Sequence, residues 1–242
     1  RAASEAKLNI GVLSALIQAG SLEGFKQSRS KVVLEAQLWH ILTVTEKKYA
    51  SHFAKKFDYD LVEIIKYLRE FKNEKGKVVI KESRYGTIKK KYVPYLEIYT
   101  KNSQSESFAN WYYEKMLLGY TYNKDLKDIF AEKRSNLMSV RTVNALEARS
   151  KAVFVGQVDD QWRGRSKNGN SYLKAIISDE SGTTPVMIFS KKMEDCEAMN
   201  GSLPQKKNIV IVKGSKADGV VFADLISIQD NKVYTKLSEL KN

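Results

Sequence analysis

Apolar side chains in the first 75 residues recur at intervals of three and four, the spacing of amphipathic helices. Residues 4–19 carry one apolar stripe, and residues 29–43 resume the same spacing after a short break. Asp60 is followed three residues later by Glu63, a helix-start signal similar to a capping box. We therefore expect the beginning of the chain to be helical.

Further along, the apolar period shortens to two, which is typical of strands. Residues 77–81 and 92–99 both alternate in this way, and residues 85–87 between them are turn material. Pro94 favours an edge strand, because proline cannot donate to a sheet ladder. The pattern predicts a β-hairpin, at about residues 76–100, inserted in the helical part.

Five short alternating apolar runs follow from residue 152 onward. They cover residues 152–163, 171–178, 183–189, 208–214 and 219–228. Residues 190–201, between the third and fourth runs, are long enough for one helix. Three strands, a helix and two strands are the order of a five-stranded OB-fold barrel. We expect an α+β chain with a helical part in residues 1–150 and an OB-fold domain in residues 151–242.

The composition of the chain indicates the compartment in which the protein works. The chain has 242 residues, of which 43% are hydrophobic, and it contains no apolar run long enough to cross a membrane. We expect no membrane partner. The single cysteine, Cys196, excludes an internal disulfide and suits a reducing compartment, so we expect a cytoplasmic protein. The chain begins with Arg1 rather than methionine, and we expect it to be a piece of something longer.

The chain is strongly basic, with 41 Lys and Arg against 28 Asp and Glu, a net charge of +13. Residues 1–150 hold 27 bases and 17 acids (27 − 17 = +10), and residues 151–242 hold 14 and 11 (14 − 11 = +3). Such a balance favours phosphate-rich partners, because each neutralised phosphate releases counterions. Net charge also serves solubility, and that alternative stays open.

Catalytic signatures are missing from the sequence. There is no phosphate-binding P-loop and no H-E-x-x-H zinc motif, and Cys196 has no histidine close by in sequence. One cysteine and two histidines do not suffice for a closed zinc site. We expect no catalytic residue, no metal site and no cofactor in this chain.

The first two barrel strands supply the best candidates for a binding site. OB-fold barrels hold nucleic-acid strands across their second and third strands, with bases stacked on aromatic rings and cations along the phosphates. The candidate residues are Trp162, Arg163, Arg165, Lys167, Tyr172 and Lys174. Alternation places Tyr172 and Lys174 on the outward side of their strand. The alternative is that Trp162 and Tyr172 only cover the mouth of the barrel.

The helical part supplies two weaker candidates. Lys26 and Arg29 flank the turn between the first two helices, where backbone N–H groups could hold a phosphate. Lys89, Lys90 and Lys91 lie in the predicted hairpin and suit sequence-independent phosphate contact. A plain corner between two helices, and an edge strand that carries lysines against aggregation, are the alternatives.

Three stretches, in this order, resemble one family: the α subunit of bacterial DNA polymerase III, the C-family replicative polymerases. Residues 9–25 with Arg29 resemble the stretch that closes the family's tandem helix-hairpin-helix region. Residues 111–120 are similar to the helix before the family's OB domain, and residues 153–189 resemble the opening of that domain. Residues 120–124 depart from the family's L-S-G-H-P loop.

The resemblance implies the DNA-binding C-terminal part of a bacterial or phage polymerase. The helical, helix-hairpin-helix-like part would contact duplex DNA, and the barrel would contact the single-stranded template. The nucleotidyltransferase palm and its Mg²⁺ would lie outside this chain. The sliding clamp, through residues 104–108, and other replisome subunits are further candidate partners. A stand-alone OB-fold adaptor for RNA or tRNA, or a protein-interaction module of the replisome, remain alternatives.

Overall fold

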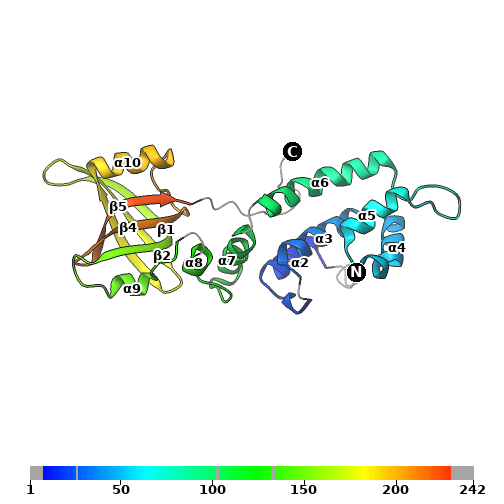
Figure 1. Ribbon diagram of the computed structural model, residues 1–242, viewed down its shortest axis with the longest axis horizontal. Coiled ribbons are helices and arrows are strands. Elements are labelled where there is room, and N and C mark those ends of the chain that lie inside the picture. The colour runs from blue at the N-terminus through cyan, green and yellow to red at the C-terminus, as the bar shows by residue number, and fades with distance from the viewer. Residues whose placement is uncertain (1–7, 26, 102–103, 132–133, 230–242) are drawn as a thin grey trace. The chain divides into compact units, whose positions relative to one another are not determined.

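The computed structural model describes residues 8–25, 27–101, 104–131 and 134–229 (Figure 1). It confirms an α+β chain in which a helical region precedes a closed five-stranded barrel. The described residues divide into two compact units, one ending at Gly119 and the other beginning at Tyr120. None of the helices in the described part is long and apolar enough to cross a membrane.

Capping side chains set the start of several helices in the first unit. Its helices are α2 (Ile10–Gln18), α3 (Arg29–Ile41), α4 (Val44–Phe53), α5 (Leu61–Glu70), α6 (Glu82–Lys101) and α7 (Gln104–Leu118), with 3-10 turns η1 (Glu23–Phe25) and η2 (Ala54–Phe57). Ser28 accepts a hydrogen bond from the backbone N–H of Lys31 and starts α3. Asp60 accepts one from the N–H of Glu63, which confirms the predicted start of α5. Side-chain acceptors here satisfy N–H groups that have no partner within the helix.

The core of this unit lies among α3, α5 and α6. Leu38 of α3, Ile65 and Leu68 of α5 and Ile88 of α6 are fully buried in one cluster. In α5 the buried residues recur at intervals of three and four, as the apolar stripe predicts. Complete burial of a large apolar side chain contributes roughly 1.5–3 kcal/mol to the stability of the folded protein.

The predicted β-hairpin is wrong, because helix α6 runs through both the expected turn and the expected second strand. Tyr85, Ile88 and Tyr92 are spaced by three and four residues and are all buried, so a helix presents them together to the core. An isolated bridge between Lys72 and Val78 closes a tight turn before α6, and this turn lies at the start of the expected hairpin rather than at its predicted turn. Burial of the aromatic stripe outweighs the strand preference of its tyrosine, valine and isoleucine residues.

The second unit is built around a closed barrel with the strand order β1-β2-β3-β5-β4. Its strands are β1 (Lys151–Arg165), β2 (Ser171–Asp179), β3 (Gly182–Phe189), β4 (Ile209–Ala217) and β5 (Val220–Ile228). Only β3 and β5 pair in parallel; the other neighbours are antiparallel. Helix α10 (Ser190–Asn200) connects β3 to β4. The predicted order of three strands, a helix and two strands is confirmed, and the barrel is OB-fold-like.

Strand β1 closes the barrel by pairing with two strands in succession. Its first half, Lys151–Gln157, pairs with β4, and its second half pairs with β2 through Arg165. The change of partner coincides with a bulge between Val158 and Asp160, which lets one strand turn a barrel corner. At Gly156 a β-carbon would stand 2.5 Å from Ile177 and 2.7 Å from the carbonyl oxygen of Ser178, so only glycine fits this bend.

Two short helices, α8 (Leu126–Phe130) and α9 (Val140–Asn144), precede the barrel and are capped by its β2–β3 turn. The carboxylate of Asp179 accepts a hydrogen bond of 2.7 Å from the N–H of Val140. Glu180 accepts one of 3.2 Å from the N–H of Leu126. This acidic turn therefore has a structural role, because it tethers the two helices at the start of the unit to the barrel.

Glu46 connects α4 to α6 in the helical unit. It completes a capping box with Thr43, and its carboxylate accepts a hydrogen bond of 3.1 Å from Arg84. Arg84 also donates to the carbonyl oxygen of Ile41 at 2.7 Å. Burial by itself would raise the pKa of Glu46, but the hydrogen bonds from Arg84 and from the Thr43 N–H hold that pKa below its usual value.

We predict that Glu46→Gln lowers the free energy of unfolding by about 1–3 kcal/mol at pH 7, measured by urea denaturation. A carboxyl group whose pKa is lowered by folding stabilises the protein above its unfolded pKa, about 4.3, and loses that contribution as the pH falls. The difference between variant and wild type should therefore shrink below about pH 4. Glu82→Gln, at a side chain that is 76% exposed, is the control and should change little. Equal effects at both positions would contradict this role of Glu46.

Candidate nucleic-acid interface

Strand pairing aligns two rows of side chains on the outside of the barrel. Trp162 of β1 lies opposite Lys174 of β2, which lies opposite Met187 of β3, which lies opposite Phe222 of β5. The neighbouring row runs from Gly164 through Tyr172 to Phe189. Side chains two residues apart on a strand share a side, so both rows belong to one surface.

We call Trp162, Tyr172, Phe189 and Phe222 the aromatic face. The ring centroids of Tyr172 and Phe189 are 5.9 Å apart, and those of Phe189 and Phe222 are 5.7 Å apart. The ammonium of Lys174 lies 5.1 Å from the centre of the Trp162 ring, within the range of a cation–π contact. Aromatic surface and positive charge therefore meet on strands β1, β2, β3 and β5.

The aromatic face plays no part in the barrel core, because the alternate residues fill the interior. Leu173, Ala175 and Ile177 of β2, and Val186 and Ile188 of β3, are buried inside the barrel. On the outside, Trp162 is 40% exposed and Phe222 is 43% exposed. Because these partly exposed rings are grouped on one side of the barrel, they form a candidate binding surface.

The structure places three of the six predicted barrel residues on the aromatic face and the other three at the end of the β1–β2 ribbon. Trp162, Tyr172 and Lys174 share the aromatic face. Arg163 pairs with Leu173 and Arg165 pairs with Ser171, so both arginines project from the opposite side of the β1–β2 ribbon, where they are exposed. Lys167 is exposed in the turn after β1, where the N–H of Ser166 donates to Asn170. Arg163, Arg165 and Lys167 thus lie along the end of the ribbon, whereas Lys174 lies among the rings.

Arg29 is a buried, ion-paired residue and not the phosphate contact that we expected. It is only 6% exposed, and it forms ion pairs with Glu23 and, at 2.8 Å, with the fully buried Glu114 of α7. It also donates to the carbonyl oxygen of Gln18, the last residue of α2, at 2.9 Å. The prediction that Arg29 offers its charge to a phosphate is wrong, because its guanidinium joins α2, η1 and α7 internally.

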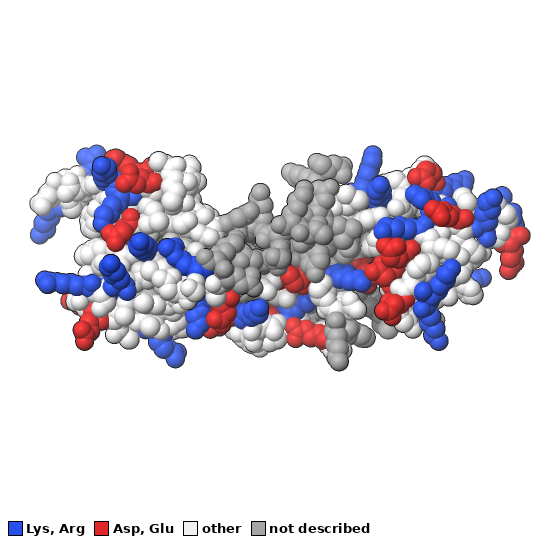
Figure 2. Space-filling model, in the orientation of Figure 1, with Lys and Arg blue, Asp and Glu red and all other residues white. Residues whose placement is uncertain are grey.

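The other predicted cations of the helical unit are less well placed to contact phosphates together than they would be on a hairpin. Lys89, Lys90 and Lys91 are exposed on α6. Consecutive helix residues point about 100° apart, so the three do not share one face. Lys26 lies outside the described residues. Figure 2 shows Lys and Arg side chains of both units interspersed with Asp and Glu, rather than one continuous basic patch on the face in view.

Sequence reasoning missed Met187, Phe189 and Phe222, although the alternation that could find them was present. In residues 183–189 the small and branched residues alternate with Met187 and Phe189, and in residues 219–228 Phe222 stands between Val221 and Ala223. What the sequence could not supply is the parallel pairing of β3 with β5, which joins Phe222 to the rest.

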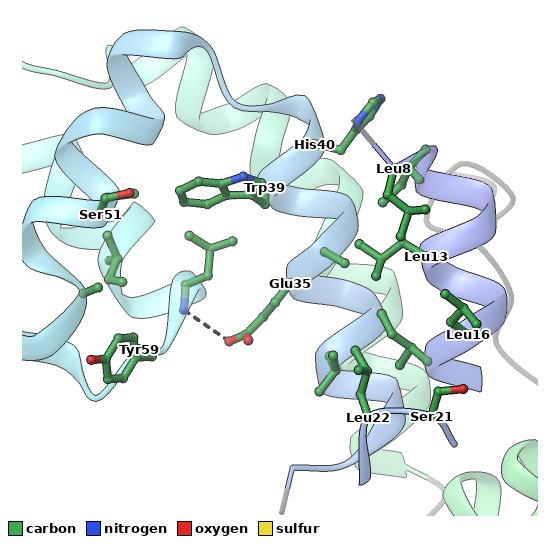
Figure 3. Close-up of a pocket in the computed structure, with 18 of the residues that line it drawn as sticks. Leu8, Leu13, Leu16, Ser21, Leu22, Glu35, Trp39, His40, Ser51 and Tyr59 are labelled. Atoms are coloured by element: carbon green, nitrogen blue, oxygen red, sulfur yellow. Dashed lines mark hydrogen bonds between the residues drawn. The ribbon is translucent and has the colours of Figure 1, made fainter. Parts of the chain in front are cut away.

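The helical unit contains a cavity of about 770 Å³ among α2, α3, α4, η2 and α5 (Figure 3). Leu8 and Leu16 line its α2 side, and Trp39 lies across it on α3. Its half-buried carboxyl group, Glu35, already accepts a hydrogen bond of 3.2 Å from the N–H of Leu61. Burial raises the pKa of Glu35. In the described parts of the chain, no group of three His, Cys, Asp or Glu side chains could hold a metal ion.

Comparisons with known proteins give a fold likeness only. No family model and no curated protein matches the chain. Among solved structures, the mitochondrial single-stranded DNA-binding protein Rim1 from S. cerevisiae aligns with 36% of this chain and 100% of its own, at 18% identity and a TM-score of 0.29. The tRNAIle2 agmatidine synthetase TiaS aligns with 36% of this chain and 20% of its own, at 18% identity and a TM-score of 0.27. What those proteins bind is their own property, so the function of this chain has to come from its own geometry.

We predict that Arg29→Ala lowers the free energy of unfolding by about 3–5 kcal/mol, because the buried carboxylate of Glu114 would lose the guanidinium that balances its charge. The measurement is a urea titration monitored by circular dichroism. Lys89→Ala, at an exposed position of α6, is the control and should stay within about 0.5 kcal/mol of wild type. A stable Arg29→Ala protein would show that the buried ion pair contributes nothing.

Proposed function

We propose that the barrel binds single-stranded nucleic acid through its aromatic face. The observation that carries this proposal is the row of partly exposed rings across β1, β2, β3 and β5, with Lys174 lying over Trp162. Every base has a flat apolar face, so a set of open rings accepts bases of any sequence.

The two kinds of side chain have different tasks in this proposal. Trp162 and Phe222 are open enough to stack on bases, and each stacked base contributes about 1–3 kcal/mol. Lys174 lies between the rings, whereas Arg163, Arg165 and Lys167 lie at the end of the β1–β2 ribbon and would follow the phosphates. Bases on the rings and phosphates along the ribbon end fit a single strand better than a duplex, because paired bases are stacked on each other.

The finer proposal is that this barrel guides the template strand of a C-family DNA polymerase. Its support is the resemblance of residues 9–25, 111–120 and 153–189 to that family. In this arrangement the helical unit contacts duplex DNA, with Lys89, Lys90 and Lys91 of α6 as the exposed candidates. An RNA-binding adaptor is the alternative, and competition between DNA and RNA oligonucleotides of one sequence separates the two, because 2′-hydroxyl contacts favour RNA.

We predict that Trp162→Ala and Phe222→Ala each weaken binding to an oligo(dT) strand by about 1–3 kcal/mol, measured by fluorescence anisotropy. Met199→Ala is the matched control, because Met199 is a 50% exposed apolar residue of α10 outside the aromatic face. Unchanged affinity in both aromatic variants, or an equal loss in the control, would contradict stacking on this face.

Binding to the same oligonucleotide should weaken steeply with salt, with a slope of log K against log[salt] of about −0.7 for each phosphate contacted. Lys167→Gln should reduce that slope by about 0.7, because the exposed Lys167 is one of the cations proposed to follow the phosphates. Lys56→Gln is the control, because Lys56 belongs to the helical unit, where its ammonium lies 4.0 Å from the centre of the Tyr67 ring. A flat salt response would show that phosphates do not contribute.

A further inference from the structure

Gly164 and Tyr172 lie directly opposite each other on the paired strands β1 and β2. A β-carbon on Gly164 would stand 2.5 Å from both Cζ and Oη of Tyr172, and 3.0 Å from its Cε1. These three atoms form the far end of the ring, so the tyrosine side chain lies across strand β1 in the space that any other residue would fill. Contacts this short do not occur between real side chains.

Backbone conformation does not explain the glycine at this position. Several glycines of the chain have a positive φ, among them Gly169 and Gly219 in turns, but Gly164 lies within the regular part of β1 and is not one of them. Other residues could therefore adopt its backbone angles. The Tyr172 ring occupies the space that a side chain at position 164 would take, so such a side chain would require the ring to move.

The position of the Tyr172 ring determines how the aromatic face is assembled. On β1, Trp162 precedes Gly164 by two residues, which places the two positions about 6–7 Å apart on the same side of the strand. On its other side, Tyr172 contacts Phe189, which contacts Phe222. The ring therefore lies between position 164 of β1 and Phe189 of β3, on the side of the sheet that also carries Trp162.

We propose that Gly164 is a positioning residue for nucleic-acid binding, because it lets the Tyr172 ring lie across β1 and join Trp162 to Phe189 in one stacking surface. The inference rests on the proposed function of the barrel. A side chain at position 164 would push the ring away from the strand, since the far end of a tyrosine moves more easily than the backbone. The face would then lose one stacking position without losing an aromatic residue.

The test is a double-mutant cycle on the intact chain, with oligo(dT) affinity measured by fluorescence anisotropy. The variants are Gly164→Ala, Tyr172→Ala and the two together. We expect Gly164→Ala to weaken binding about fivefold or more, the lower end of the loss of one stacked base. Because the glycine acts through the tyrosine, it should have no further effect once Tyr172 is alanine. Gly86→Ala is the matched control, since a β-carbon there meets nothing within 4 Å.

A second readout keeps the test independent of how well the variants fold. In the wild-type protein, a ring lying over Gly164 should shift the NMR signals of its α-protons upfield, and Tyr172→Ala should remove that shift. Unshifted α-protons in the wild type would overturn the inference. The melting temperature of each variant shows whether affinity is compared between folded proteins.

The outcomes separate this inference from the function on which it rests. If Gly164→Ala binds as tightly as wild type while Tyr172→Ala binds weakly, the positioning role is wrong and the stacking face stands. If Gly164→Ala weakens binding equally with and without Tyr172, the glycine acts by another route and the inference is again wrong. If neither Tyr172→Ala nor Trp162→Ala weakens binding, the proposed function itself fails.

Discussion

The closure of the barrel through β1 is the constraint on which the binding surface depends. A closed barrel has an interior of limited size, and each strand can send only every second residue into it. Apolar residues of several sizes, such as Ala175, Val186 and Phe154, take those places. Trp162 and Phe222 occupy the alternate positions and are therefore outside and partly open, where pairing between strands brings them into one surface. A core requirement thus shapes the face that we propose to bind nucleic acid.

The strands of the barrel could be predicted from the sequence because the alternation of apolar and polar residues is a local pattern. Alternation within residues 171–178 placed Tyr172 and Lys174 outward, and the pairing of β2 agrees with that placement. It could not show which strands become neighbours across the barrel, and so Phe222 of β5 was not connected with Phe189 of β3. Proximity of Arg163 to Trp162 in sequence was also misleading, since adjacent strand residues face opposite sides.

The helical unit was less predictable, because tertiary contacts decide its details. Tyrosine, valine and isoleucine around Pro94 favour a strand locally, yet Tyr85, Ile88 and Tyr92 are buried as one stripe of α6. Arg29 offered a plausible phosphate contact in sequence, but its partner Glu114 lies 85 positions away and could not be identified from spacing. The positive charge of residues 1–150 therefore includes cations, such as Arg29, that form ion pairs within the fold. The net charge overstates the number of cations that can bind a phosphate.

The measurement that tests the central claim most directly is NMR shift mapping of the isotope-labelled chain during titration with oligo(dT). The account predicts that the largest changes of amide and side-chain signals fall on Trp162, Tyr172, Lys174, Phe189 and Phe222. It also predicts smaller changes at the buried strand residues behind them. Changes confined to the helical unit, with the aromatic face unaffected, would contradict it.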